Sequence, residues 1–127
     1  MNPFDAASPF DARYYFADPG FFARLQPFVS ENAQVRYLAR VEATLAETLA
    51  DIGVCPRGAA AEIARAAEGV QPDRVYEEES RIQHNIRALV NCIAREVSAS
   101  SRPYVHLFAT SADIMDTARA LCLRETT

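Results

Sequence analysis

A repeat of apolar residues between Ser30 and Ile52 constrains the fold of this 127-residue chain more than any other feature. Apolar residues return there every three or four positions, which places them on one face of an α-helix. The residues of this stripe are Val35, Leu38, Val41, Leu45, Leu49 and Ile52. Ser30 suits the N-cap, and Gly53 suits the turn after the helix. Because no segment alternates apolar and polar residues as a half-buried strand does, the sequence predicts an all-α protein.

Three more helices are predicted further along the chain. One starts at Pro56, runs through Ala67 and is closed by Gly69, and one spans about Pro72 to Val97. The last starts near Ser111 and has no glycine or proline to end it before the chain does. Residues 1–29 combine prolines with many aromatic side chains, so we expect an extended arm that packs on the helical domain of residues 30–127 or on a partner chain.

Composition and charge exclude several classes of function. The hydrophobic content of 50% is that of a globular protein, and the net charge of -4 argues against binding nucleic acid through phosphates. The chain has no lysine, so neither a Schiff base nor a lysine-containing phosphate loop is available. Three widely spaced cysteines and no apolar run long enough to span a membrane favour a reducing, cytoplasmic setting. No metal and no cofactor are expected, since no cluster has ligand spacing.

His84 is the first candidate for chemistry. If residues 72–97 form one helix, His84 lies roughly opposite the apolar stripe, near Arg81, Arg87 and Asn91. The residues alone slightly favour a histidine that faces solvent. The alternative is a histidine in an electropositive cleft, where it could donate to an anion or exchange a proton.

A second candidate region leads into the last helix. His106 precedes the pair Thr110-Ser111, and Thr110, Ser111 and Asp113 are all N-cap residue types. An ordinary helix cap is the simpler interpretation. The functional alternative is an anion site, because the free N–H groups and the dipole of a helix N-terminus attract negative charge.

The segment Val105–Ala118 resembles the first signature region of the fumarase/aspartase superfamily, and within it that of the adenylosuccinate lyases. The resemblance continues in the same order along the chain, although only with the N-terminal part of the family. The other matching segments are Ser8–Tyr14, Phe28–Glu31, Arg40–Glu42, Leu49–Pro56 and His84–Ile86.

The resemblance implies an N-terminal helical domain of an enzyme that eliminates fumarate from a small anionic succinyl-nucleotide substrate. It implies that His84 is a catalytic residue beside the reacting group. It makes Arg13 and Tyr14 a phosphate clamp, which on the residues alone could equally be a surface turn. His106 would contact the nucleotide part, and Thr110 and Ser111 a succinyl carboxylate. No membrane or nucleic-acid partner is expected, and the complete enzyme would be a homotetramer.

Three residues depart from the family pattern. Gln83 and Asn85 replace an arginine and an aspartate on either side of His84, and Asn85 is kept as a substrate-binding candidate. Phe108 replaces a glycine, which predicts a narrowed site or a strained loop. These departures put the exact substrate in doubt.

The family's serine-bearing catalytic loop and its second catalytic histidine do not occur in this chain, so we expect the chain alone to be inactive. Two alternatives stay open. The chain could act as a helical interaction module, or it could derive from an enzyme of the carboxymuconate cycloisomerase type.

Overall fold

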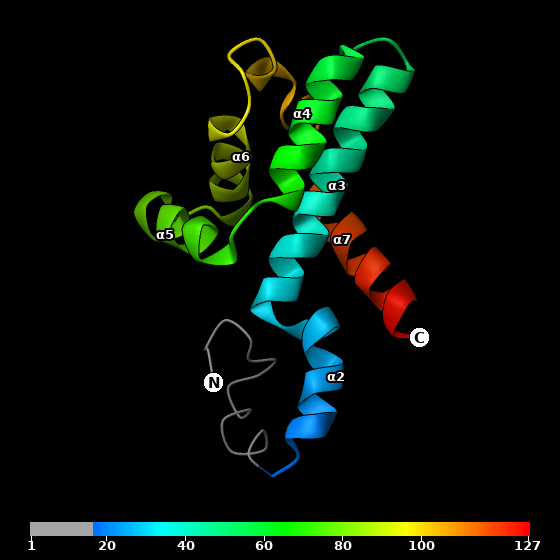
Figure 1. The fold of residues 1–127 in the computed structure, drawn as a ribbon, viewed down its shortest axis with the longest axis vertical. Helices are drawn as coiled ribbons and strands as arrows, with labels where there is room; N and C mark the ends of the chain where they lie inside the picture. The colour runs from blue at the N-terminus through cyan, green and yellow to red at the C-terminus, as the bar shows by residue number, and fades with distance from the viewer. Residues whose placement is uncertain (1–16) are drawn as a thin grey trace.

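A computed structural model describes residues 17–127 and contains helices but no strand within that range (Figure 1). The all-α prediction is therefore confirmed for these residues. Arg13 and Tyr14 lie outside them. The helices are α2 (Pro19–Val29), α3 (Glu31–Asp51), α4 (Arg57–Glu68), α5 (Pro72–Ile82), α6 (Asn85–Arg95), the 3-10 helix η2 (Arg102–Tyr104) and α7 (Ser111–Thr126).

Helix α3 is the element on which the other helices pack. It begins where the Ser30 hydroxyl accepts the Ala33 N–H at 3.1 Å. It ends before Gly53, whose φ of +78° is the left-handed conformation that glycine adopts without strain. Both ends are as predicted. In Figure 1, α4 runs back alongside α3 after the turn at residues 52–56, so the two form an antiparallel pair.

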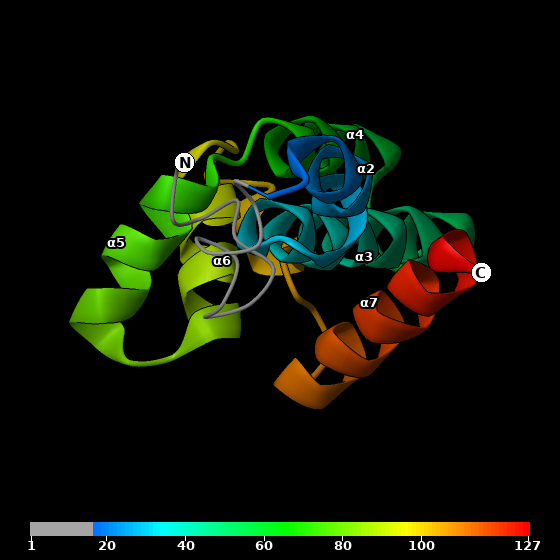
Figure 2. The same ribbon diagram turned by 90° about the horizontal axis from the view of Figure 1, so that it is seen from below.

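The main core lies between α3, α4 and α6. Ile63 of α4 and Leu89 and Ile93 of α6 are completely buried within it. Figure 2 shows α4 and α7 on opposite sides of α3. The C-terminal end of α7 is tied to α3 by Glu125, which accepts from the Tyr37 hydroxyl at 2.9 Å and from Arg40 at 3.0 Å.

The single helix predicted over Pro72–Val97 is wrong, because the chain turns between α5 and α6. Gln83 has a φ of +57° and ends α5, and His84 then caps α6. The apolar spacing continues across the break, so periodicity alone does not reveal it. The two helices are held together instead by Glu78 of α5, which bonds to Asn91 and Arg95 of α6.

The extended conformation predicted for residues 1–29 is wrong over Pro19–Val29, which is α2. The Asp18 carboxylate accepts the Phe21 N–H at 3.0 Å and so caps the helix. Pro19 occupies the first turn, where its missing N–H costs nothing. The proline content of this segment therefore does not predict its secondary structure. No helix within residues 17–127 combines the length and apolar character needed to cross a membrane.

Candidate functional site

The start of α6 and the segment that leads into α7 line one pocket of about 280 Å³. The lining residues are His84, Ile86, Arg87, Val90, His106, Ala109, Thr110 and Ser111. Four candidate residues from the sequence, His84, His106, Thr110 and Ser111, thus lie around one pocket. What they bind there stays a prediction.

His84 is exposed, as predicted, but for a different reason from the one that the sequence suggested. It is the N-cap residue of α6, and its Nδ1 accepts the Arg87 N–H at 3.2 Å. Its ring therefore stands at the positive end of a helix dipole rather than on the polar face of a longer helix.

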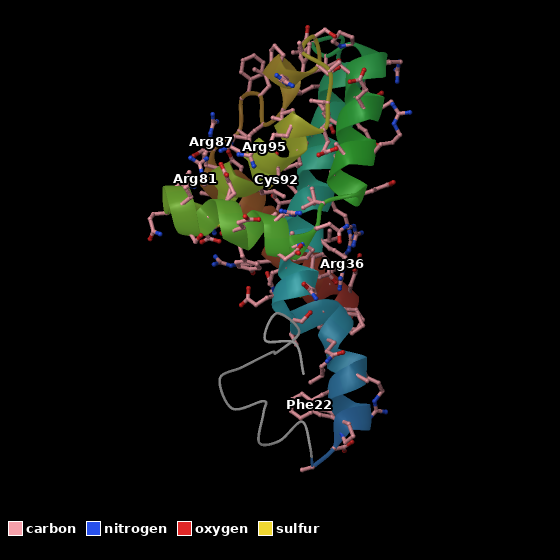
Figure 3. All side chains as sticks on the ribbon, turned by 60° about the vertical axis from the view of Figure 1, so that its left-hand side comes forward. Phe22, Arg36, Arg81, Arg87, Cys92 and Arg95 are labelled. Carbon is pink, nitrogen blue, oxygen red and sulfur yellow. The ribbon has the colours of Figure 1, made fainter. Side chains whose placement is uncertain are left out.

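Arg87 joins His84 at the same end of α6. Its side chain is exposed, and no carboxylate of residues 17–127 forms an ion pair with it. Figure 3 shows Arg81, Arg87 and Arg95 on the side of the molecule that α5 and α6 form. Arg81 and Arg95 are both paired with Glu78, so Arg87 is the guanidinium at the pocket that is available to an anion.

The other wall of the pocket is the N-terminus of α7. Thr110 is the N-cap, and its N–H donates to the Asp113 carboxylate at 2.8 Å. Ser111 is the first residue of the helix. The starts of two helices, one of 11 and one of 16 residues, thus converge on one pocket. The dipoles of the two helices and the N–H of Ser111 make the pocket suited to an anion.

A buried carboxylate on α3 contacts the ring of His106. The Nδ1 of this ring lies 2.7 Å from Oε1 of Glu42 on α3. Glu42 is only 1% exposed, and within residues 17–127 its Oε2 has no hydrogen-bond partner. Burial raises the pKa of Glu42, and the neighbouring His106 partly offsets that effect.

The sequence does not single out Glu42 as a site residue, but it carries a signal. Residues 35, 38, 42, 45 and 49 follow one another at steps of four and three, and only position 42 among them is not apolar. A glutamate on the buried stripe of a helix needs a partner, because a buried carboxylate is costly unless it is paired.

The backbone is strained on both sides of the pocket. Within residues 17–127, the non-glycine residues with positive φ are Gln83 at +57°, His106 at +61° and Phe108 at +66°. Each such conformation costs about 1–3 kcal/mol, and such costs cluster at functional sites. The strained loop expected at Phe108 is confirmed. The narrowing is not, because Phe108 is 80% exposed and does not line the pocket.

Asn85 does not join the other candidates. It lines a different pocket, between α3, α5 and α7, and its amide nitrogen lies 3.7 Å from Sδ of Met115. Within the described residues, no group of three or more histidine, cysteine or acidic side chains could hold a metal ion.

Comparison with curated proteins finds several adenylosuccinate lyases. The chain is 32% identical to the enzyme of Methanocaldococcus jannaschii over 122 residues, which are 94% of this chain and 25% of that enzyme. It is 42% identical to the Archaeoglobus fulgidus enzyme over 76% of this chain and 21% of that enzyme. It is also 27% identical, over 105 residues, to an N-acetyl-S-(2-succino)cysteine lyase of Enterococcus italicus. No family model matches the chain, and no solved structure matches it significantly.

Proposed function

Since this chain is homologous to adenylosuccinate lyases and spans about a quarter of their length, we propose that it forms part of a carbon–nitrogen lyase. The reaction would release fumarate from a succinyl-amino substrate of purine nucleotide synthesis. In the complete enzyme we expect a homotetramer in the cytoplasm, with this chain supplying one wall of the active site.

The observation that supports this proposal is the convergence of two helix N-termini on the pocket of His84, His106, Thr110 and Ser111. A succinyl group carries two carboxylates, and elimination builds up further negative charge beside one of them. The hydroxyls of Thr110 and Ser111 and the N–H of Ser111 would hold a carboxylate, and Arg87 would add a charge. His84 would lie next to the bond that breaks and exchange a proton there.

The relatives differ in the atom that carries the succino group of the substrate. The name of the Enterococcus italicus relative describes a succino group on sulfur, whereas adenylosuccinate carries it on nitrogen. What the two share is the succino group, and that is the part the pocket is suited to bind. Of the three departures from the family pattern, Gln83 adjoins His84 and Phe108 adjoins Ala109, so they border the pocket without lining it.

Binding tests the proposal first. We expect the chain to bind adenylosuccinate, or fumarate more weakly, in calorimetric titrations. Ser111→Ala should weaken binding about 10-fold or more, because a hydrogen bond to a charged group contributes about 1.5–3 kcal/mol. Ser80→Ala is the matched control, since Ser80 is an exposed serine on α5 away from the pocket. Equal binding by the two variants would contradict the proposed carboxylate site.

Complementation tests catalysis. The chain alone should release no fumarate from adenylosuccinate. Fumarate should be released when the chain is mixed with an adenylosuccinate lyase that lacks the matching quarter. His84→Ala should then lower turnover by about 10²–10⁴-fold, the usual contribution of one acid–base group. Complex formation without turnover would favour the interaction module. Full turnover by the chain alone would refute the expectation that it is inactive.

A further inference from the structure

We infer that the two histidines of the pocket have opposite tautomers, and that Glu42 is the positioning residue that sets the tautomer of His106. The tautomers follow from hydrogen bonds within the chain. Only the kind of ligand that the two rings would bind rests on the proposed function.

The contact of His106 with Glu42 fixes the first tautomer. With Glu42 ionised, its carboxylate can only accept hydrogen bonds, so the ring nitrogen 2.7 Å from Glu42 Oε1 carries the proton. His106 is thus an Nδ1–H imidazole, and Nε2 is its remaining ring nitrogen, with a free lone pair. The His106 side chain is 17% exposed, and the residue lines the pocket.

The cap of α6 fixes the second tautomer. The backbone N–H of Arg87 donates to Nδ1 of His84, so this nitrogen must be unprotonated. A neutral His84 therefore carries its proton on Nε2. The same pocket is then bordered by one ring that accepts through Nε2 and one that donates through Nε2.

The charged groups around the two rings indicate which side of the pocket suits an anion and which suits a hydrogen-bond donor. Among the described residues, Arg87 on α6 lines the pocket, Glu42 on α3 contacts His106, and Asp113 in the first turn of α7 accepts the Thr110 N–H. On the side of His84 and Arg87, the pocket offers donors to an anionic oxygen. Beside His106 it offers an acceptor, which suits a hydroxyl or N–H of the ligand. The predicted contact of His106 with the nucleotide part is therefore a contact with a hydrogen-bond donor, such as a sugar hydroxyl.

Nitrogen NMR can read both tautomers directly. The chain has only two histidines, so an untagged, ¹⁵N-histidine-labelled sample gives two ring systems in a long-range proton–nitrogen spectrum. The spectrum is recorded at about pH 8, where an ordinary free imidazole is neutral. We expect Nδ1 protonated in His106 and Nε2 protonated in His84. His84→Asn, which keeps a good N-cap residue, assigns the signals.

Two other results for His106 would overturn the inference. A proton on Nε2 alone would mean that Glu42 is protonated and donates to Nδ1. Protons on both nitrogens at about pH 8 would mean that the ring is an imidazolium and cannot accept. The wild-type spectrum distinguishes all three states without any variant that might fail to fold.

Glu42→Gln tests the positioning role. A glutamine amide can donate as well as accept, so the His106 signals should shift toward the Nε2–H form, while those of His84 stay unchanged. Glu47→Gln changes an exposed glutamate on the same helix and should leave both rings as in the wild type. Unchanged His106 signals in a folded Glu42→Gln variant would refute the role of Glu42.

The two proposals can fail separately. If the tautomers are as inferred but neither adenylosuccinate nor fumarate perturbs the ring nitrogens, the lyase proposal fails and the positioning by Glu42 stands. If adenylosuccinate binds but His106 Nε2 carries a proton in the free chain, the inference fails and the lyase proposal stands.

Discussion

Both the backbone conformation and the exposure of Phe108 are unfavourable for the stability of the fold. It holds a φ of +66°, and its large apolar ring is 80% exposed. A left-handed backbone costs a non-glycine residue about 1–2 kcal/mol, and little burial compensates for it here.

Phe108→Gly should therefore stabilise the chain. The relieved strain exceeds the added entropy of glycine in the unfolded chain, so the expected gain is about 0.5–1 kcal/mol in the free energy of urea unfolding. Phe108→Ala removes the ring but keeps a Cβ, and it should bring little gain. A loss of stability in the glycine variant would mean that the ring makes contacts outside the described residues.

At the scale of elements, the junction between α2 and α3 depends on one side chain. Ser30 is 1% exposed, and its hydroxyl donates to the Gln26 carbonyl at 2.6 Å while accepting the Ala33 N–H. The same atom thus ends one helix and begins the next.

Ser30→Ala should destabilise the chain by about 1–2 kcal/mol, since it removes the N-cap and leaves the N–H of the buried Ala33 without its acceptor. Urea unfolding followed by circular dichroism measures the loss. Thr44→Ala, an exposed hydroxyl in the middle of α3, is the control and should change stability little. Equal losses in the two variants would show that the cap contributes nothing specific.

The same elements show what the sequence can predict. The stripe of α3, its cap at Ser30 and its end at Gly53 are local features, and local rules predict them correctly. The break at Gln83 is not local, because it depends on Glu78 holding α5 against α6. The helix α2 was missed because proline weighs against helix in general, whereas α2 has Pro19 in its first turn and also includes Pro27 near its C-terminal end.

At the scale of the whole molecule, Glu78 makes the stability of the fold depend on pH in acid. Hydrogen bonds from Arg81, and then from Arg95 and Asn91, lower the pKa of Glu78 to about 2. In the unfolded chain a glutamate has a pKa of about 4.3, so the unfolded state binds the proton more tightly. The stabilising effect of this carboxylate is therefore complete above about pH 5 and is lost as the pH falls toward 2.

Glu78→Gln should remove that dependence. The melting temperature of the wild type should fall between about pH 5 and pH 2 more steeply than that of the variant. Glu77→Gln, an exposed glutamate of the same helix, should keep the wild-type slope. Parallel curves for wild type and Glu78→Gln would show that other carboxylates control acid unfolding.

The pocket, too, could be predicted only in part. Its polar residues come from motifs that can be read along the chain, and the helix start at Ser111 follows from N-cap chemistry. The roles of Arg87 and Glu42 depend on packing, since Glu42 meets His106 across 64 residues of sequence.

That separation in sequence makes the His106 ring a reporter of folding order. Every residue that lines the pocket lies between His84 and Ser111, whereas Glu42 belongs to α3. Glu42 reaches His106 only once α3 has docked. A refolding experiment that follows the ring nitrogens of both histidines would therefore separate two events, the capping of α6 at His84 and the arrival of α3 at His106.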